Sequence, residues 1–79
     1  MLTELADANK VIGLKQTKKA LRDARAKKVY LSMNCDIRLR EIISALCAQG
    51  NVPVIEVPTM DELGHACGIQ VGAAVAAIV

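Results

Sequence analysis

Four short apolar runs alternate with helix-like segments along this chain, and that alternation constrains the fold more strongly than any other feature. The runs are KVIG, KVYLSM, VPVIEV and AAVAAIV, at residues 10–13, 28–33, 52–57 and 73–79. Their β-branched and aliphatic residues are typical of strands, and Pro53 near the start of the third run favours the edge of a sheet. Strands that alternate with helices predict an α/β fold, a three-layer α/β/α sandwich with a mixed sheet of about four strands.

Four helices are expected before and between these strands, over residues 3–9, 14–26, 37–49 and 59–68. Asp36 can cap the third helix and Gly50 can close it. TMDE at residues 59–62 is a T-x-x-E capping box that opens the fourth helix, which Gly68 can end. The 79 residues, 53% of them hydrophobic, suffice for one small domain over residues 1–79.

Helical spacing predicts which side chains of the two longer helices face the core. For residues 14–26 the inward face is Leu14, Thr17, Ala20, Leu21 and Ala24. For residues 37–49 it is Ile37, Leu39, Ile42, Ile43, Leu46 and Cys47.

The charge of the chain is concentrated in one segment. The net charge is only +2, but the segment from Lys10 to Lys28 holds eight of the ten basic residues and a single acid, Asp23. The basic residues are Lys10, Lys15, Lys18, Lys19, Arg22, Arg25, Lys27 and Lys28. Such polarisation points to an anionic partner.

Three of these lysines stand at the expected start of a helix, directly after Gly13. A helix N-terminus presents unpaired N–H groups and the positive end of the helix dipole, so lysines there are unfavourable unless an anion binds. One interpretation is a solvated basic face made by Lys15, Lys18, Lys19 and Arg22. The other is an anion site, because Gly13 permits close approach of a phosphate to the free N–H groups. A Walker motif is absent, so the anion would be nucleic acid rather than a bound nucleotide.

Gln16 occupies the same first turn, where its amide can donate to and accept from a base edge, as an alternative to being an ordinary exposed side chain. A second candidate is LGHACGIQVGAAV at residues 63–75. Ile69 and Val71 follow Gly68 there. They either make the apolar contact of a helix C-terminal cap or cover an unstacked base.

The aromatic content excludes one mode of RNA binding. Tyr30 is the only aromatic residue of the chain, and it lies in an expected interior strand. Recognition-motif domains and OB-folds stack bases on aromatic rings, so this chain would have to use a helix end, lysines and aliphatic loops instead.

Catalysis finds little support in the sequence. Cys35 stands beside Asp36 with no histidine near it in sequence, and His65 reads as a structural residue. The three cysteines form no CxxC pair, which indicates reduced thiols and no metal site. We therefore expect a cytoplasmic protein that is not an enzyme, with no cofactor, no metal and no membrane segment, and a monomer when free.

The segments VIGLKQTKKAL, VPVIEVP and MDELGHACGIQVGAAVAAIV, in that order, resemble the kink-turn-binding ribosomal protein family. This family includes the archaeal multifunctional large-subunit protein, the core protein of box C/D ribonucleoproteins and small bacterial homologues. The resemblance covers residues 5 to 79. It implies an α/β/α fold that binds RNA kink-turns, possibly in ribosomal RNA, where tandem sheared G·A pairs follow a sharp bend.

The family motif at the helix start is Gly-x-Asn-Glu, with a Lys three residues after the Glu, and it maps onto Gly13, Lys15, Gln16 and Lys19. Lys15 stands where the family motif has Asn, and Gln16 stands where it has Glu, a combination that resembles the bacterial branch. The resemblance also implies that the apolar loop covers the bulge nucleotide. The alternative is a protein-interaction domain on the same fold. The residues expected to bind RNA are Gly13, Leu14, Lys15, Gln16, Lys18, Lys19, Arg22, Gly68, Ile69, Gln70 and Val71.

Overall fold

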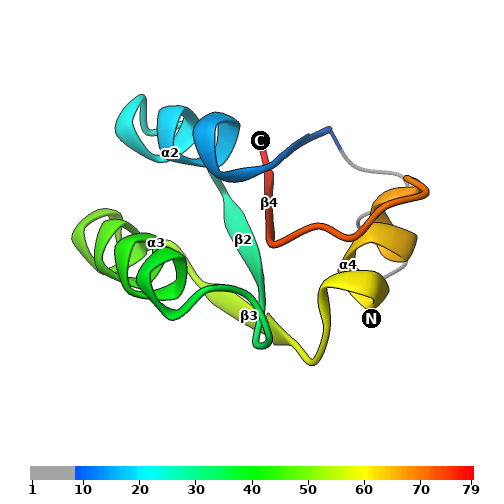
Figure 1. Ribbon diagram of the computed structural model, residues 1–79. Helices are drawn as coiled ribbons and strands as arrows, with labels where there is room; N and C mark the ends of the chain where they lie inside the picture. The colour runs from blue at the N-terminus through cyan, green and yellow to red at the C-terminus, as the bar shows by residue number, and fades with distance from the viewer. Residues whose placement is uncertain (1–8) are drawn as a thin grey trace.

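A computed structural model describes residues 9–79 and confirms the α/β/α sandwich (Figure 1). The helix expected over residues 3–9 falls, apart from Asn9, outside the described residues. In chain order the elements are β1 (Lys10–Ile12), α2 (Leu14–Arg22), β2 (Lys28–Ser32), α3 (Ile37–Gly50), β3 (Val54–Val57), α4 (Met60–Cys67) and β4 (Val75–Ile78).

The four described strands form one mixed sheet in the order β1-β4-β2-β3. β4 runs antiparallel to both of its neighbours, so that Ala77 stands opposite Val11 on one side and Val29 on the other. β2 and β3 are parallel. The prediction that the strand after Pro53 lies at an edge is confirmed, since β3 ends the order.

Side chains that alternate along the strands supply two cores, one on each face of the sheet. Val29 and Leu31 of β2 pack under α2 and α3, together with Ile43 and Cys47 of α3. Tyr30, between them in sequence, packs on the opposite face beneath α4. Figure 1 shows α2 and α3 on one side of the sheet and α4 on the other.

The helix expected over residues 14–26 is shorter than predicted, because it ends at Arg22. Ala24 has a left-handed backbone with a φ of 57°, which an α-helix cannot contain. The N–H of Arg25 then bonds back to the carbonyl of Ala20 at 2.8 Å, and the chain turns toward β2. Ala24 is therefore exposed, whereas Thr17 and Ala20 are buried as predicted.

The cap of α3 is confirmed, since the Asp36 carboxylate accepts the N–H of Arg38 at 2.8 Å. Its inward face is narrower than predicted. Ile37 is 62% and Ile42 42% exposed, and the fully buried stripe is Ile43 and Cys47. At the C-terminus Asn51, with a φ of 56°, takes the left-handed position expected for Gly50.

Both ends of α4 are confirmed. The hydroxyl of Thr59 accepts the N–H of Glu62 at 3.1 Å, as the capping box predicts. At the other end Gly68 has a φ of 81° and closes the helix. The loop at residues 68–74 then leads directly into β4.

Candidate nucleic-acid interface

The first turn of α2 begins at Gly13, which links the helix to the centre of the sheet. The N–H of Gly13 donates to the carbonyl of Val75 in β4 at 2.9 Å. Gly13 has a φ of 102° and a ψ of 161°, a conformation that side-chain-bearing residues rarely adopt. A Cβ on this residue would meet no atom within 4 Å, so the backbone here is open to a ligand.

The N-terminus of α2 has unused hydrogen-bond donors. Its N-cap is a glycine without a side-chain hydrogen bond, and its first turn contains no acidic residue. The first intrahelical bond runs from the N–H of Thr17 to the carbonyl of Gly13 at 3.0 Å. The N–H groups of Leu14, Lys15 and Gln16 therefore have no acceptor among residues 9–79, and together with the lysines they favour an anion.

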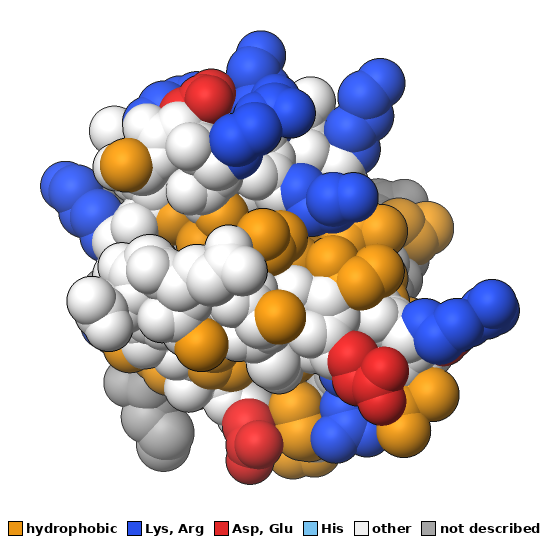
Figure 2. Space-filling model, turned by 90° about the vertical axis from the view of Figure 1, so that its left-hand side faces the viewer, with side chains coloured by type: hydrophobic (Ala, Val, Ile, Leu, Met, Phe, Trp, Pro, Cys, Tyr) orange, Lys and Arg blue, Asp and Glu red, His pale blue; other side chains and the backbone are white. Residues whose placement is uncertain are grey.

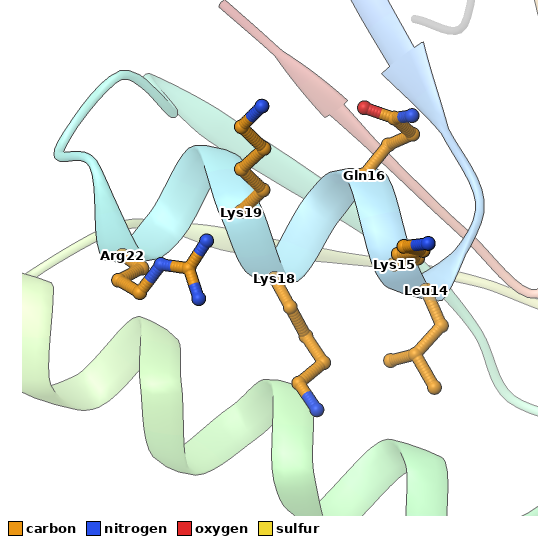
Figure 3. A pocket seen from close by; sticks show the side chains of 6 residues that line it. All are labelled: Leu14, Lys15, Gln16, Lys18, Lys19 and Arg22. Atoms are coloured by element: carbon orange, nitrogen blue, oxygen red, sulfur yellow. The ribbon is translucent and has the colours of Figure 1, made fainter.

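A hollow of about 400 Å³ lies on the exposed side of α2 (Figure 3). Its lining consists of six residues predicted from the sequence: Leu14, Lys15, Gln16, Lys18, Lys19 and Arg22. Figure 3 shows that some of these side chains point to different sides of α2. Gln16 and Lys19 point away from α3, whereas Leu14 and Lys18 point toward it.

Positive charge dominates this side of the molecule. Figure 2 shows Lys and Arg side chains gathered where α2 lies, above a band of hydrophobic side chains. Arg22 is partly neutralised because its Nε lies 3.9 Å from the carboxylate of Asp23. Lys15, Lys18 and Lys19 have no ion-pair partner in the described part of the chain.

In the loop after α4, Ile69 and Val71 have different environments. The sequence left open whether they make the apolar contact of the helix cap or cover a base. The N–H of Ile69 bonds to the carbonyl of Gly64 at 3.1 Å, and its side chain packs against the core under α4. Ile69 thus makes the apolar contact of the helix cap. Val71 is 70% exposed, so its side chain is available to a ligand. A second hollow, of about 380 Å³, is lined by Asp61, His65, Ile69, Gln70 and Val71.

The loop after α4 packs on Gly64, a residue that the sequence analysis did not single out. A Cβ on Gly64 would collide with the carbonyl oxygen of Val71, so the loop rests directly on the backbone of α4. Gly72 is packed less tightly, since its Cβ would lie 3.1 Å from the Cβ of Met60, a close contact and not an overlap. The sequence did contain one sign of this contact. A glycine inside a helix lowers helix stability by about 1 kcal/mol relative to alanine, so its presence indicates close packing at that position.

The fold brings the first turn of α2 and the loop to the same end of the sheet. Gly13 is bonded to Val75, and Val71 precedes Val75 by four residues. Four residues of extended chain span at most about 14 Å. One ligand of nucleic-acid size can therefore contact both elements.

The described residues hold no group of three or more His, Cys, Asp or Glu side chains that could bind a metal ion. Cys47 and Cys67 are buried, and burial raises the pKa of both thiols, which keeps them protonated. The thiol of Cys35 is half-buried and donates to the carbonyl of Ser32 at 3.1 Å. Among the described helices, none has the length and apolar character needed to span a bilayer.

Sequence comparison finds bacterial relatives of similar length. A protein of Geobacillus kaustophilus named RNA-binding protein GK0100 is 46% identical over 68 residues, which cover 86% of this chain and 83% of the relative. RNA-binding protein TTE2299 of Caldanaerobacter subterraneus subsp. tengcongensis is 35% identical over 76 residues, which cover 96% of this chain and 93% of the relative.

Solved structures share the fold. A protein of unknown function from Bacillus halodurans C superposes with a TM-score of 0.89 at 25% identity, covering 98% of this chain and 81% of that one. The Giardia lamblia 15.5kD RNA binding protein superposes with a TM-score of 0.86 at 24% identity. The superposition covers 98% of this chain and 66% of the Giardia protein. The model of the ribosomal protein L7Ae/L30e/S12e/Gadd45 family matches residues 2–79. This chain is therefore a member of the L7Ae/L30e/S12e/Gadd45 family.

Proposed function

We propose that this protein is a non-enzymatic RNA-binding protein that recognises kink-turns, including those of ribosomal RNA. The observation that carries the proposal is the first turn of α2, where unused N–H groups, lysines and Gln16 share one exposed surface. The names of the bacterial relatives support the RNA-binding part. The protein would act in the cytoplasm as a monomer that needs no cofactor.

Base recognition in this proposal belongs to Lys15, Gln16 and Lys19. A lysine can donate to O6 or N7 of guanine, and a glutamine amide can both donate and accept on a base edge. Gln16 and Lys19 point to the same side of α2 (Figure 3), so both can reach one pair of sheared G·A bases. Gly13 lets the RNA backbone approach the free N–H groups of the first turn.

The remaining residues supply charge and apolar contact. Lys18 and Arg22 would bind flanking phosphates, with Leu14 as the apolar wall of the hollow. In the loop, Val71 would cover the bulge nucleotide. Ile69, half-buried against the core under α4, would support Val71, and Gly68 and Gln70 complete the turn.

Binding would be coupled to bending of the RNA. A kink-turn exchanges between an extended and a kinked state, and a ligand shifts that equilibrium only by its difference in affinity for the two. A surface made of a helix end and a separate loop fits the kinked state, because only a bent RNA presents both the G·A pairs and the bulge to it.

A gel-shift titration with a kink-turn RNA and a matched RNA whose G·A pairs are replaced by Watson–Crick pairs tests the proposal. We expect much tighter binding to the kink-turn. Equal affinity for the two RNAs would refute kink-turn recognition and leave electrostatic association alone. Absence of binding to both would favour a protein-interaction domain.

A further inference from the structure

The proposed site does not use four basic residues of the charged segment, Lys10, Arg25, Lys27 and Lys28, and two of these lie together in one turn. Arg25 and Lys27 lie in the turn between α2 and β2, past the C-terminal end of α2 and away from its first turn. Both are exposed. Neither has a hydrogen-bond or ion-pair partner for its side chain among residues 9–79.

The turn that carries them is fixed by backbone hydrogen bonds at both ends. The carbonyl of Ala20 accepts the N–H groups of Arg25 at 2.8 Å and Ala26 at 3.3 Å. The N–H of Lys27 donates to the carbonyl of Ile78 in β4 at 2.7 Å. The backbone beneath the two side chains is thus held in place, which reduces the ordering entropy that a binding partner has to overcome.

Helix capping does not account for these two charges. The last carbonyl groups of α2 already accept backbone N–H groups, including that of Asp23, which donates to Lys19 at 2.9 Å. The basic residues of the last helical turn, Lys19 and Arg22, already complement the helix dipole. Asp23 is the acid nearest in sequence, and it faces Arg22.

Arg25 and Lys27 are also separate from the other basic residues near this end of the sheet. Lys10 of β1 stands opposite Ile78 of β4. Residues directly opposite on paired strands share a face, and Ile78 packs in the core beneath α4. Lys28, the first residue of β2, also stands opposite Ile78. Lys10 and Lys28 therefore both lie on the α4 side of the sheet, whereas the turn continues from α2.

The nine residues of α2 place the turn about 13 Å from the first helical turn. An RNA held at its bend by that first turn continues as a double helix, whose backbone carries phosphate charges every few Å. We infer that Arg25 and Lys27 bind phosphates of the RNA helix that flanks the bend, as a second contact outside the kink-turn. This inference rests on the proposed kink-turn recognition.

The test compares a kink-turn RNA whose flanking helices are each cut to a few base pairs with RNAs in which either helix is extended by a full turn. The double variant Arg25→Gln/Lys27→Gln removes the two charges from exposed positions. Arg38→Gln/Arg40→Gln on α3 removes the same formal charge elsewhere and controls for net charge; unlike Arg25, Arg38 is paired, with Asp36 at 3.5 Å. Affinities are measured over a range of salt concentrations, with thermal melts to confirm that both variants fold.

For one of the extended RNAs, we expect wild type to bind more tightly than it binds the short RNA. The double variant should bind that extended RNA about tenfold more weakly than wild type does, and the slope of log affinity against log salt should fall by ~1–2. Its affinity for the short RNA should change little. The control variant should not distinguish the RNAs. If the double variant matched the control on every RNA while wild type still preferred the kink-turn over its G·A-disrupted partner, the inference would be wrong and the proposed function would stand. Loss of that preference in wild type would instead refute the proposed function.

Discussion

At the scale of single residues, Gln16 and Lys18 belong to the same hollow but point to different sides of α2 (Figure 3). We expect Gln16→Ala to reduce the discrimination between a kink-turn RNA and its G·A-disrupted control, because the proposed function assigns base recognition to its amide. Lys18→Ala should weaken binding to both RNAs alike and lower the salt slope by ~1, because the proposed function assigns Lys18 to phosphate. Parallel gel-shift titrations measure both effects. Unchanged discrimination in Gln16→Ala would remove this residue from base recognition.

Thr17, in contrast to the exposed Gln16 and Lys18 beside it in sequence, faces the core beneath the first turn of α2. It is fully buried, and its hydroxyl has no hydrogen-bond partner in the described structure. We expect Thr17→Val to raise the free energy of unfolding by about 1 kcal/mol, since it replaces an unsatisfied hydroxyl by a methyl group of similar size.

Ser32 supplies the matched control for Thr17. It is equally buried, but its hydroxyl donates to the carbonyl of Ala74 at 2.8 Å. Ser32→Ala should therefore lower the unfolding free energy by about 1 kcal/mol. Urea denaturation of the two variants should give changes of opposite sign. A loss of stability in Thr17→Val would show that its hydroxyl is paired, for example with a buried water.

At the scale of elements, the contact between α4 and the loop depends on Gly64, because a Cβ there would meet the carbonyl of Val71. We expect Gly64→Ala to displace the loop, lowering the unfolding free energy by about 1–3 kcal/mol and weakening RNA binding. Gly50→Ala is the control, since its Cβ would lie an ordinary 3.5 Å from Val52. It should leave binding unchanged and raise stability slightly. Equal behaviour of the two variants in melts and titrations would contradict the role given to Gly64.

The sequence predicted correctly those elements that carry a capping residue or a strand pattern within their own residues. Asp36, Thr59 and Gly68 act within a few residues of their positions, so their effects could be inferred without the fold. The end of α2 could not be inferred in this way. The turn at Ala24 accompanies a bond from Lys27 to β4, and that bond exists only in the folded sheet.

At the scale of the whole molecule, the candidate site joins two segments far apart in sequence through the bond between Gly13 and Val75. A ligand that binds only this assembled surface stabilises the fold. At a free RNA concentration of 100 times Kd the gain is about 2.7 kcal/mol. For a domain of this size that corresponds to a rise in Tm of roughly 10–20 °C.

Thermal melts with and without a short kink-turn RNA measure this rise. The G·A-disrupted RNA at the same concentration is the control and should shift Tm much less. Equal shifts with the two RNAs would indicate that charge alone stabilises the protein. No shift with either would contradict binding to the folded surface.

The sequence by itself determined the α/β/α class, the positions of the strands, the caps at Asp36, Thr59 and Gly68, and the basic first turn of α2. These features depend on residues that are neighbours along the chain. Only the tertiary structure decided that Ile69 packs against the core while Val71 is exposed, and that the loop rests on Gly64. It also decided that Ile37 and Ile42 lie outside the buried stripe of α3. Burial depends on which elements cover one another, and helical spacing alone does not contain that information.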